Sequence, residues 1–210
     1  VEEYGIVANS STVSGDLTSL TVMASGTGAR ARGIYASNSD VELALSGDLT
    51  VEGRSGVAEG ISASTNSDVK FTGVKAMSVS SGSGGAYGIQ SYGSTVSGDL
   101  AAMTVTATGS AEGIHASDSG VVKLSAAGPV SVTSKNSSAY GININSGKAS
   151  TINIAKDLAV KGAAGGAGVT AQGAAHQITV GGLTDVSVTK YGENGVYAAN
   201  NSNVNLNGGV

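Results

Sequence analysis

The chain has 210 residues, a formal net charge of −4, 33 glycines, one proline and no cysteine. Without cysteine it can form neither disulfides nor a thiolate-ligated zinc site. Its 11 Lys and Arg residues are scattered singly and offer no basic patch for nucleic acid. It contains no apolar run of about 18 residues, so we expect no membrane-spanning helix.

The composition favours strands over helices. Glycine is about twice as frequent as in average proteins, and Ser, Thr, Asn and β-branched residues are abundant. Such chains form many short strands joined by tight turns. With one Phe and no Trp, the core must be built from Val, Ile, Leu and Ala.

Two motifs repeat along the chain with a period of about 27 residues. A glycine followed by Ile or Val occurs at Gly5, Gly33, Gly60, Gly88, Gly113, Gly141, Gly168 and Gly195. An apolar residue followed two positions later by Val repeats with the same period, from Leu20–Val22 to Val186–Val188. Agreement between two independent motifs indicates a repeat architecture.

One period reads G-I-x-A-S, then S-x-V-x-L, then G-D-L-x-V-x-A, and each piece alternates apolar and polar residues as strands do. Ile34 and Ala36 would face inward, and Tyr35 and Ser37 outward. Three strands that cannot bury their apolar faces alone describe one turn of a solenoid. We therefore expect an all-β, right-handed parallel β-helix with three short strands per turn of about 27 residues.

No linker interrupts the repeat, so residues 1–210 are expected to form a single β-helix fragment of about eight turns within a longer protein. The repeat glycine is expected to supply a backbone angle that costs other residues about 1–2 kcal/mol.

Aspartates recur in the G-D-L motif and near the first corner of each turn. They are Asp16, Asp48, Asp99 and Asp157 in the motif, and Asp40, Asp68 and Asp118 near the corner. A carboxylate ladder could bind calcium or line the cleft of a polysaccharide-cleaving β-helix. The third, fifth and seventh repeats lack the motif aspartate, so we interpret these residues as turn formers that bond to their own backbone. No metal or cofactor is expected.

The sequence contains no catalytic signature, and we expect no enzyme activity. His115 and His176 lack a positioned partner and are expected at the surface. The glycine-rich stretch 162–168 lacks the Lys-Ser or Lys-Thr of a phosphate loop. The local charge group of Arg30, Arg32, Arg54 and Glu59 is too sparse for a catalytic groove.

Tyrosines are the best candidates for ligand contact. Tyr35, Tyr92 and Tyr197 are expected to face outward, where their rings could stack on sugars, although they lie in non-adjacent turns and form no continuous stripe. The other repeat tyrosines precede the glycine and are expected to cover a corner: Tyr4, Tyr87 and Tyr140.

Repeats of the type A-x-G-I-x-A-S-x-S-x-V-x-L-x-x-x-G-D-L-x-V resemble the passenger regions of autotransporters, the type V secreted adhesins of Gram-negative bacteria. The resemblance covers the whole chain. It implies a right-handed β-helix held outside the cell by a C-terminal barrel beyond this sequence. An extracellular or cell-surface stalk or adhesive face would follow, with a glycan or a host-surface protein as partner.

Two alternatives stay open. The chain could be a carbohydrate-active β-helix, such as a polysaccharide lyase or a tailspike-like protein. It could also be a self-associating filament subunit, because solenoid ends without caps can stack.

Overall fold

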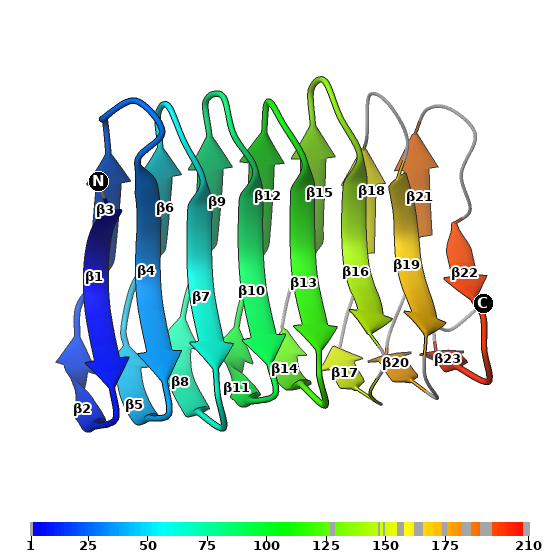
Figure 1. The fold of residues 1–210 in the computed structure, drawn as a ribbon, viewed down its shortest axis with the longest axis horizontal. Helices are drawn as coiled ribbons and strands as arrows, with labels where there is room; N and C mark the ends of the chain where they lie inside the picture. Colours follow the sequence, from blue (N-terminus) through cyan, green and yellow to red (C-terminus); the bar gives the residue numbers. More distant parts are fainter. Residues whose placement is uncertain are drawn as a thin grey trace.

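Each strand pairs in parallel with the strand one repeat away. The computed structural model describes residues 2–126, 129–146, 148, 150–154, 158–161, 166–173, 176–181, 186–189 and 195–207. In these residues the strands form three parallel sheets, two with eight strands and one with seven. Figure 1 shows the strands stacked side by side along one axis. The prediction of an all-β parallel solenoid with three strands per turn of about 27 residues is confirmed.

The first sheet is built from the Gly-Ile segments. Its strands are β1 (Glu2–Asn9), β4 (Arg30–Ser37), β7 (Ala58–Ser64), β10 (Ala86–Tyr92), β13 (Ala111–Ser117), β16 (Ala139–Ser146), β19 (Gly166–Gly173) and β22 (Val196–Ala198).

The second and third sheets complete each turn. The second contains β2 (Thr12–Leu17), β5 (Asp40–Leu45), β8 (Asp68–Val74), β11 (Thr95–Leu100), β14 (Val121–Ala126), β17 (Thr151–Ile154), β20 (Gln177–Gly181) and β23 (Asn203–Asn207). The third contains β3 (Leu20–Ala24), β6 (Leu49–Gly53), β9 (Met77–Ser81), β12 (Met103–Ala107), β15 (Val130–Ser134), β18 (Leu158–Lys161) and β21 (Val186–Thr189). The described ranges include no helix with the length and apolar composition that a membrane span needs.

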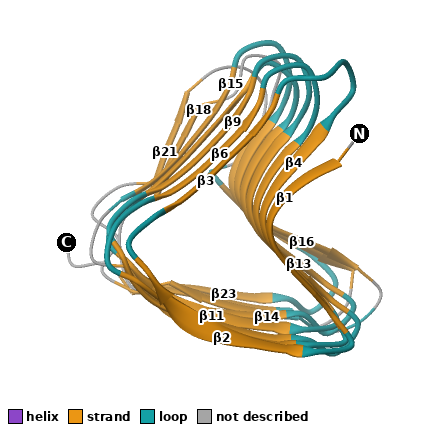
Figure 2. Ribbon diagram, turned by 90° about the vertical axis from the view of Figure 1, so that its left-hand side faces the viewer, coloured by secondary structure: helices purple, strands orange, loops and turns teal. Residues whose placement is uncertain are grey.

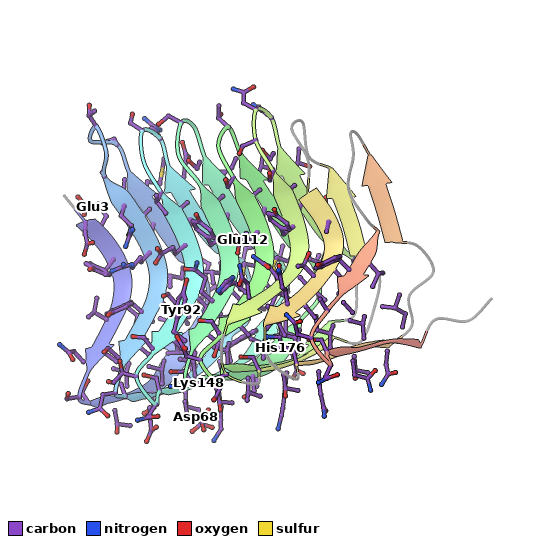
Figure 3. The ribbon with its side chains drawn as sticks, turned by 45° about the vertical axis from the view of Figure 1, so that its right-hand side comes forward. Glu3, Asp68, Tyr92, Glu112, Lys148 and His176 are labelled. Atoms are coloured by element: carbon purple, nitrogen blue, oxygen red, sulfur yellow. The ribbon has the colours of Figure 1, made fainter. Side chains whose placement is uncertain are left out.

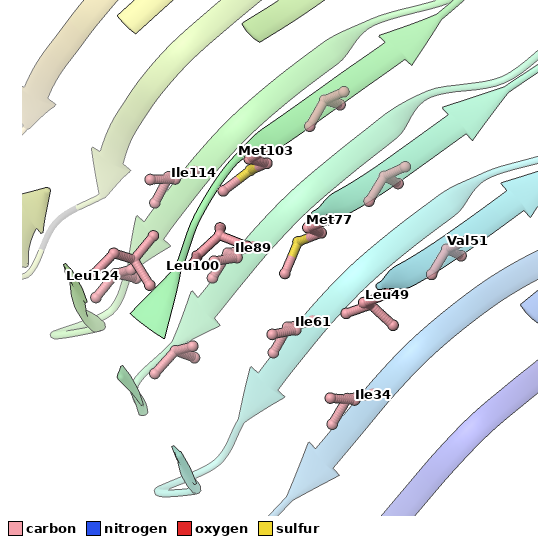
Figure 4. Close-up of a cluster of buried hydrophobic side chains, with 14 of the residues drawn as sticks. Ile34, Leu49, Val51, Ile61, Met77, Ile89, Leu100, Met103, Ile114 and Leu124 are labelled. Carbon is pink, nitrogen blue, oxygen red and sulfur yellow. The ribbon is translucent and has the colours of Figure 1, made fainter. Parts of the chain in front are cut away.

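The core consists of columns in which each residue lies over its equivalent from the neighbouring turn. The first-sheet column is Ile34, Ile61, Ile89, Ile114, Ile142 and Val169. The third sheet adds the column Leu49, Met77, Met103 and Val130. All of these side chains are buried, and several meet in the close-up of Figure 4. Burying each large apolar side chain stabilises the fold by about 1.5–3 kcal/mol.

Five of the repeat glycines are required for space rather than for an unusual backbone angle: Gly5, Gly33, Gly60, Gly88 and Gly113. A Cβ built on Gly60 would lie 2.5 Å from the carbonyl oxygen of Gly88 and 2.9 Å from Cγ2 of Val79. The described glycines with positive φ are Gly28, Gly73, Gly93 and Gly173. The prediction of a special angle at the repeat glycine is therefore wrong: a side chain there would strike the backbone of the next turn.

At the repeat glycine the alternation of inward and outward residues is interrupted, because two successive residues, Gly33 and Ile34, both face inward. Ala31, Ile34 and Ala36 are buried, whereas the guanidinium of Arg32 lies 4.7 Å from the ring centroid of Tyr35 on the outer face. Two outward residues are thus three positions apart instead of two. In Figure 2 the first sheet bends toward the interior at its middle, so its outer face is concave.

The corner between the first and second sheets is held by a ladder of buried serines. The hydroxyl of Ser67 accepts the N–H of Ser39 at 3.2 Å and donates to the carbonyl of Ser64 at 2.6 Å. Equivalent bonds run from Ser11 N–H to the hydroxyl of Ser39 and from Ser67 N–H to the hydroxyl of Ser94, each at 3.1 Å. The ladder satisfies backbone donors that would otherwise be buried without a partner.

His176 takes the place of a ladder serine. It is fully buried, its Nδ1 accepts the N–H of Ser150 at 3.1 Å, and its Nε2 donates to the carbonyl of Gln172 at 3.1 Å. The prediction of a surface histidine is wrong, because the imidazole offers the same acceptor and donor as the hydroxyl it replaces. In Figure 3 His176 lies at this corner.

We expect Gly60→Ala to lower the free energy of unfolding by about 1–3 kcal/mol, since the methyl group overpacks the bend. Urea denaturation followed by circular dichroism measures the loss. Gly15→Ala is the matched control, because a Cβ at Gly15 meets nothing within 4 Å, and its effect should stay within about 0.5 kcal/mol. Equal losses in both variants would contradict the steric account.

We expect Ser67→Ala to lower the free energy of unfolding by about 1–3 kcal/mol, because the N–H of Ser39 loses its acceptor in a buried corner. The control is Ser78→Ala on the exposed face of β9, with an expected change within about 0.5 kcal/mol. A Ser67 variant as stable as this control would show that water replaces the ladder bond.

Candidate functional site

The concave outer face of the first sheet carries two adjacent rows of polar and aromatic side chains, which we call the first-sheet groove. The row before the glycine is Tyr4, Arg32, Glu59, Tyr87, Glu112 and Tyr140. The row after it is Tyr35, Ser62, Gln90, His115, Asn143, Thr170 and Tyr197. Tyr92 joins these rows from the end of β10. Both rows run along the solenoid axis, because the first-sheet strands stack in register.

The N-terminal end of the groove is an ordered charge cluster. Nε of Arg32 lies 2.6 Å from Oε2 of Glu59, and Nε of Arg30 lies 3.5 Å from Oε1 of the same carboxylate. The side chains of Arg32 and Glu59 are only 12% and 7% exposed. The ion pair is therefore largely removed from solvent, where such pairs hold a defined geometry.

Two tyrosine rings flank this cluster. The guanidinium carbon of Arg32 lies 4.7 Å from the ring centroid of Tyr35 and 5.5 Å from that of Tyr4, within cation–π range. The two ring centroids are 6.0 Å apart. The hydroxyl of Tyr4 donates to the Glu2 carboxylate, a bond that lowers the pKa of Glu2 and raises the pKa of Tyr4. The rings are thus held in place before any ligand arrives.

The middle of the groove contains a second cluster, around Tyr92. Its ring centroid lies 5.5 Å from that of His115. Nδ1 of His115 donates to Oε2 of Glu112 at 3.0 Å, and Nδ2 of Asn143 donates to Oε1 of Glu112 at 3.4 Å. His115 faces outward as predicted, but the prediction that it lacks a partner is wrong, because the fold places this half-buried imidazole beside Tyr92 and Glu112. Figure 3 labels Tyr92 and Glu112 on this sheet.

A hollow of about 350 Å³ connects the two clusters. Its lining comes from three neighbouring turns and includes Arg32, Tyr35, Glu59, Tyr87 and Tyr92. Burial, followed by the charges of Glu112 and Glu59, raises the pKa of Tyr92 from 10.0 to about 12. Burial also raises the pKa of Tyr87. Both phenols therefore stay neutral in physiological conditions and can donate hydrogen bonds.

The side chains of the groove are of the kinds that can contact a sugar. Aromatic faces accept the apolar side of a sugar ring, and amides, carboxylates and hydroxyls bond to its hydroxyl groups. Among the described residues, no three His, Asp or Glu side chains come together as metal ligands.

The predicted contact tyrosines Tyr35, Tyr92 and Tyr197 all belong to the first sheet or its end, and Tyr197 is 38% exposed. Sequence reasoning missed that Tyr4 and Tyr87 share the same face. Their predicted role at a corner is wrong. Because the glycine and the isoleucine after it both face inward, the residue before the glycine faces outward on the same side as the residue after the isoleucine. The sequence does contain a sign of this arrangement: in every repeat two inward-type residues, Gly and then Ile or Val, follow each other inside a strand that otherwise alternates.

Tyr140 belongs to the row before the glycine as well, paired with Glu112. The predicted charge group splits in two: Arg54 pairs with Glu52 at 3.1 Å on the third sheet, away from the groove.

The aspartates of the G-D-L motif do not form one column. Asp16 lies within β2 and pairs with Ala44, Asp99 lies within β11, and Asp48 lies between β5 and β6. The motif falls at two different places because S-T-V-S-G-D-L forms a second-sheet strand by itself. Asp157 and residues 162–165 lie outside the described residues.

The corner aspartates differ from each other. Asp118 lies in the corner with φ of 53°, as a turn residue should. Asp40 and Asp68 instead begin strands β5 and β8 and are paired side by side. The prediction of turns is therefore wrong for these two residues.

A larger hollow, of about 450 Å³, lies over the second sheet. Its floor includes Gly15, Leu43, Phe71 and Gly98. Phe71 is fully buried and lies beside Gly98, where a Cβ would come 2.7 Å from its ring. This hollow exposes no aromatic face, and we take the first-sheet groove as the candidate site.

No protein-family model matches the chain, and neither a curated protein nor a solved structure matches it.

We expect the stability of the chain to fall as pH rises from 10 toward 12. The folded chain holds the phenolic proton of Tyr92 more tightly than the unfolded chain, so this contribution is complete below pH 10 and is lost as pH approaches about 12. Urea midpoints measured between pH 8 and pH 12 should decline less steeply in Tyr92→Phe. Parallel curves for the two proteins would contradict the assignment.

Proposed function

We propose that the chain is an adhesin-type β-solenoid that binds glycans through the first-sheet groove. The observation that carries this proposal is the joining of six partly exposed tyrosines and two ordered charge clusters into one concave surface. The resemblance of the repeats to autotransporter passengers supports an extracellular or bacterial cell-surface location. A glycan of a host or neighbouring cell is the proposed partner.

The shape of the molecule suits this role. A solenoid presents a long, rigid face on which many weak contacts add up. The groove side chains are already fixed by one another, as Arg32 is between Tyr4, Tyr35 and Glu59. Binding would then cost little side-chain entropy, which favours affinity from modest contacts.

We propose a binding role rather than catalysis, although one observation favours a carbohydrate-active β-helix as second candidate. Glu59 and Glu112 lie in one row with a single turn between them, on β7 and β13. Their backbones are thus about 9.6 Å apart, and a glycosidase likewise uses two carboxyl groups that stand several ångströms apart across the scissile bond. Arg30 and Arg32 hold the first carboxylate, and His115 and Asn143 hold the second, so neither stands in the apolar pocket of an acid catalyst.

The test is binding of the purified chain to an array of glycans and extracellular-matrix proteins, with sedimentation in parallel. We expect a glycan to be retained, and Tyr35→Ala, Tyr92→Ala and Tyr197→Ala each to weaken its binding about three- to tenfold, since an aromatic contact contributes about 0.5–1.5 kcal/mol.

Thr104→Ala, on the exposed face of β12, is the control and should bind as the original chain does. A folded monomer that retains nothing would reject the proposal. Shortened products from the retained glycan would favour the enzyme, and sedimentation as filaments would favour self-association.

A further inference from the structure

From β4 onward, the tyrosines of the first-sheet groove occur on every second turn. Strand β4 carries Tyr35, β10 carries Tyr87 and Tyr92, β16 carries Tyr140, and β22 carries Tyr197. The strands between them, β7, β13 and β19, carry no tyrosine. Strand β1 adds Tyr4, whose ring packs on that of Tyr35. We call each such group of tyrosine rings along the axis an aromatic station, and Tyr4 and Tyr35 together form one.

The intervening strands supply hydrogen-bonding groups instead. Strand β7 contributes Glu59 and Ser62, which are each 5% exposed and line the hollow, and β13 contributes Glu112 and His115, whose side chains are each 15% exposed. Strand β19 continues the row with Thr170. Along the axis the groove therefore alternates aromatic and polar stations with a period of two turns.

Two turns correspond to a definite length. Neighbouring strands of a sheet lie about 4.8 Å apart, so the aromatic stations repeat about every 9.6 Å. A disaccharide unit of an extended β-1,4-linked polysaccharide has a similar length, and in such chains every second sugar presents the same face. Each row runs straight along the axis, because its residues pair in register from turn to turn. Tyr87 and Tyr140 lie in the row before the glycine, and Tyr35 and Tyr197 lie in the row after it, so the stations line both sides of the groove.

The charges of the groove favour a neutral polysaccharide. The Glu59 carboxylate lies within 3.5 Å of both Arg30 and Arg32, and the Glu2 carboxylate lies 3.5 Å from Arg32, so two carboxylates balance the two guanidinium groups. The carboxylate of Glu112 adds one further negative charge. A sulfated or uronic-acid chain would meet repulsion without a compensating cation in this part of the groove.

We infer that the ligand of the groove is a neutral, extended β-1,4-linked polysaccharide that lies along the solenoid axis, with one disaccharide per two turns. The inference rests on the proposed glycan-binding function and names its substrate class. Every second sugar, which presents the same face, stacks on an aromatic station. The sugars between them form hydrogen bonds with polar side chains of the intervening strands.

Calorimetric titration with oligosaccharides of two to eight sugars tests this inference. The probes are β-1,4-linked glucose and β-1,4-linked N-acetylglucosamine oligomers, and the controls are α-1,4-linked glucose oligomers and polygalacturonate. We expect the affinity for one β-linked series to rise at least threefold from each even-numbered oligomer to the next even-numbered one. Adding a single sugar to an even-numbered oligomer should change the affinity little. The α-linked and acidic controls should bind at least tenfold more weakly.

A paired exchange tests the period without changing composition or charge. Tyr92 and Ser64 are direct partners on β10 and β7, so Tyr92→Ser combined with Ser64→Tyr moves one ring by a single turn. We expect the double variant to lose at least threefold in affinity for the hexamer. The double variant Ser78→Thr with Thr104→Ser exchanges direct partners on the third sheet and is the control. Circular dichroism confirms that both are folded.

The outcomes separate this inference from the proposed function. Equal binding of α- and β-linked oligomers, affinity without disaccharide steps, or preference for polygalacturonate would overturn the inference and leave glycan binding intact. Retention of matrix proteins alone on the array would overturn both the glycan assignment and the inference.

Discussion

The close approach of neighbouring turns at the repeat glycine is the constraint on which the rest of the structure depends. At Gly60 the carbonyl of Gly88 occupies the space of a side chain, so each turn can lie directly on the next where the first sheet bends inward. The bend brings the positions on either side of the glycine to the same outer face. A steric requirement of the backbone thereby creates both the concavity and the two rows of the groove.

The interior and the corner make that surface rigid. Columns of like residues, such as Ile61 over Ile89, keep every turn in register, and the serine ladder fixes the chain where it leaves the first sheet. Because the backbone cannot shift, the outward side chains hold constant spacing along the axis. Stability of the core and precision of the groove are therefore consequences of the same stacking.

The repeat period, the three sheets and the inward columns could be predicted from the sequence, since every turn encodes them again. The outward groove could not, because simple alternation places Tyr87 and Gln90 on opposite faces, and only the extra residue at Gly88 brings them together. His176 was missed because the ladder is formed between turns and leaves no local signal in the sequence. The G-D-L motif misled because the same letters form a strand at Asp16 and a corner at Asp48.

We propose that the concave face of the first sheet binds the ligand. Because the chain has no cysteine, Ser64→Cys in the groove and Ser78→Cys on the third sheet each provide a unique position for a bulky fluorescent label. Titration of both labelled proteins with the glycan retained on the array measures how each label changes the affinity. We expect the label at position 64 to abolish binding and the label at position 78 to leave it unchanged. Full binding by the protein labelled at position 64 would contradict it.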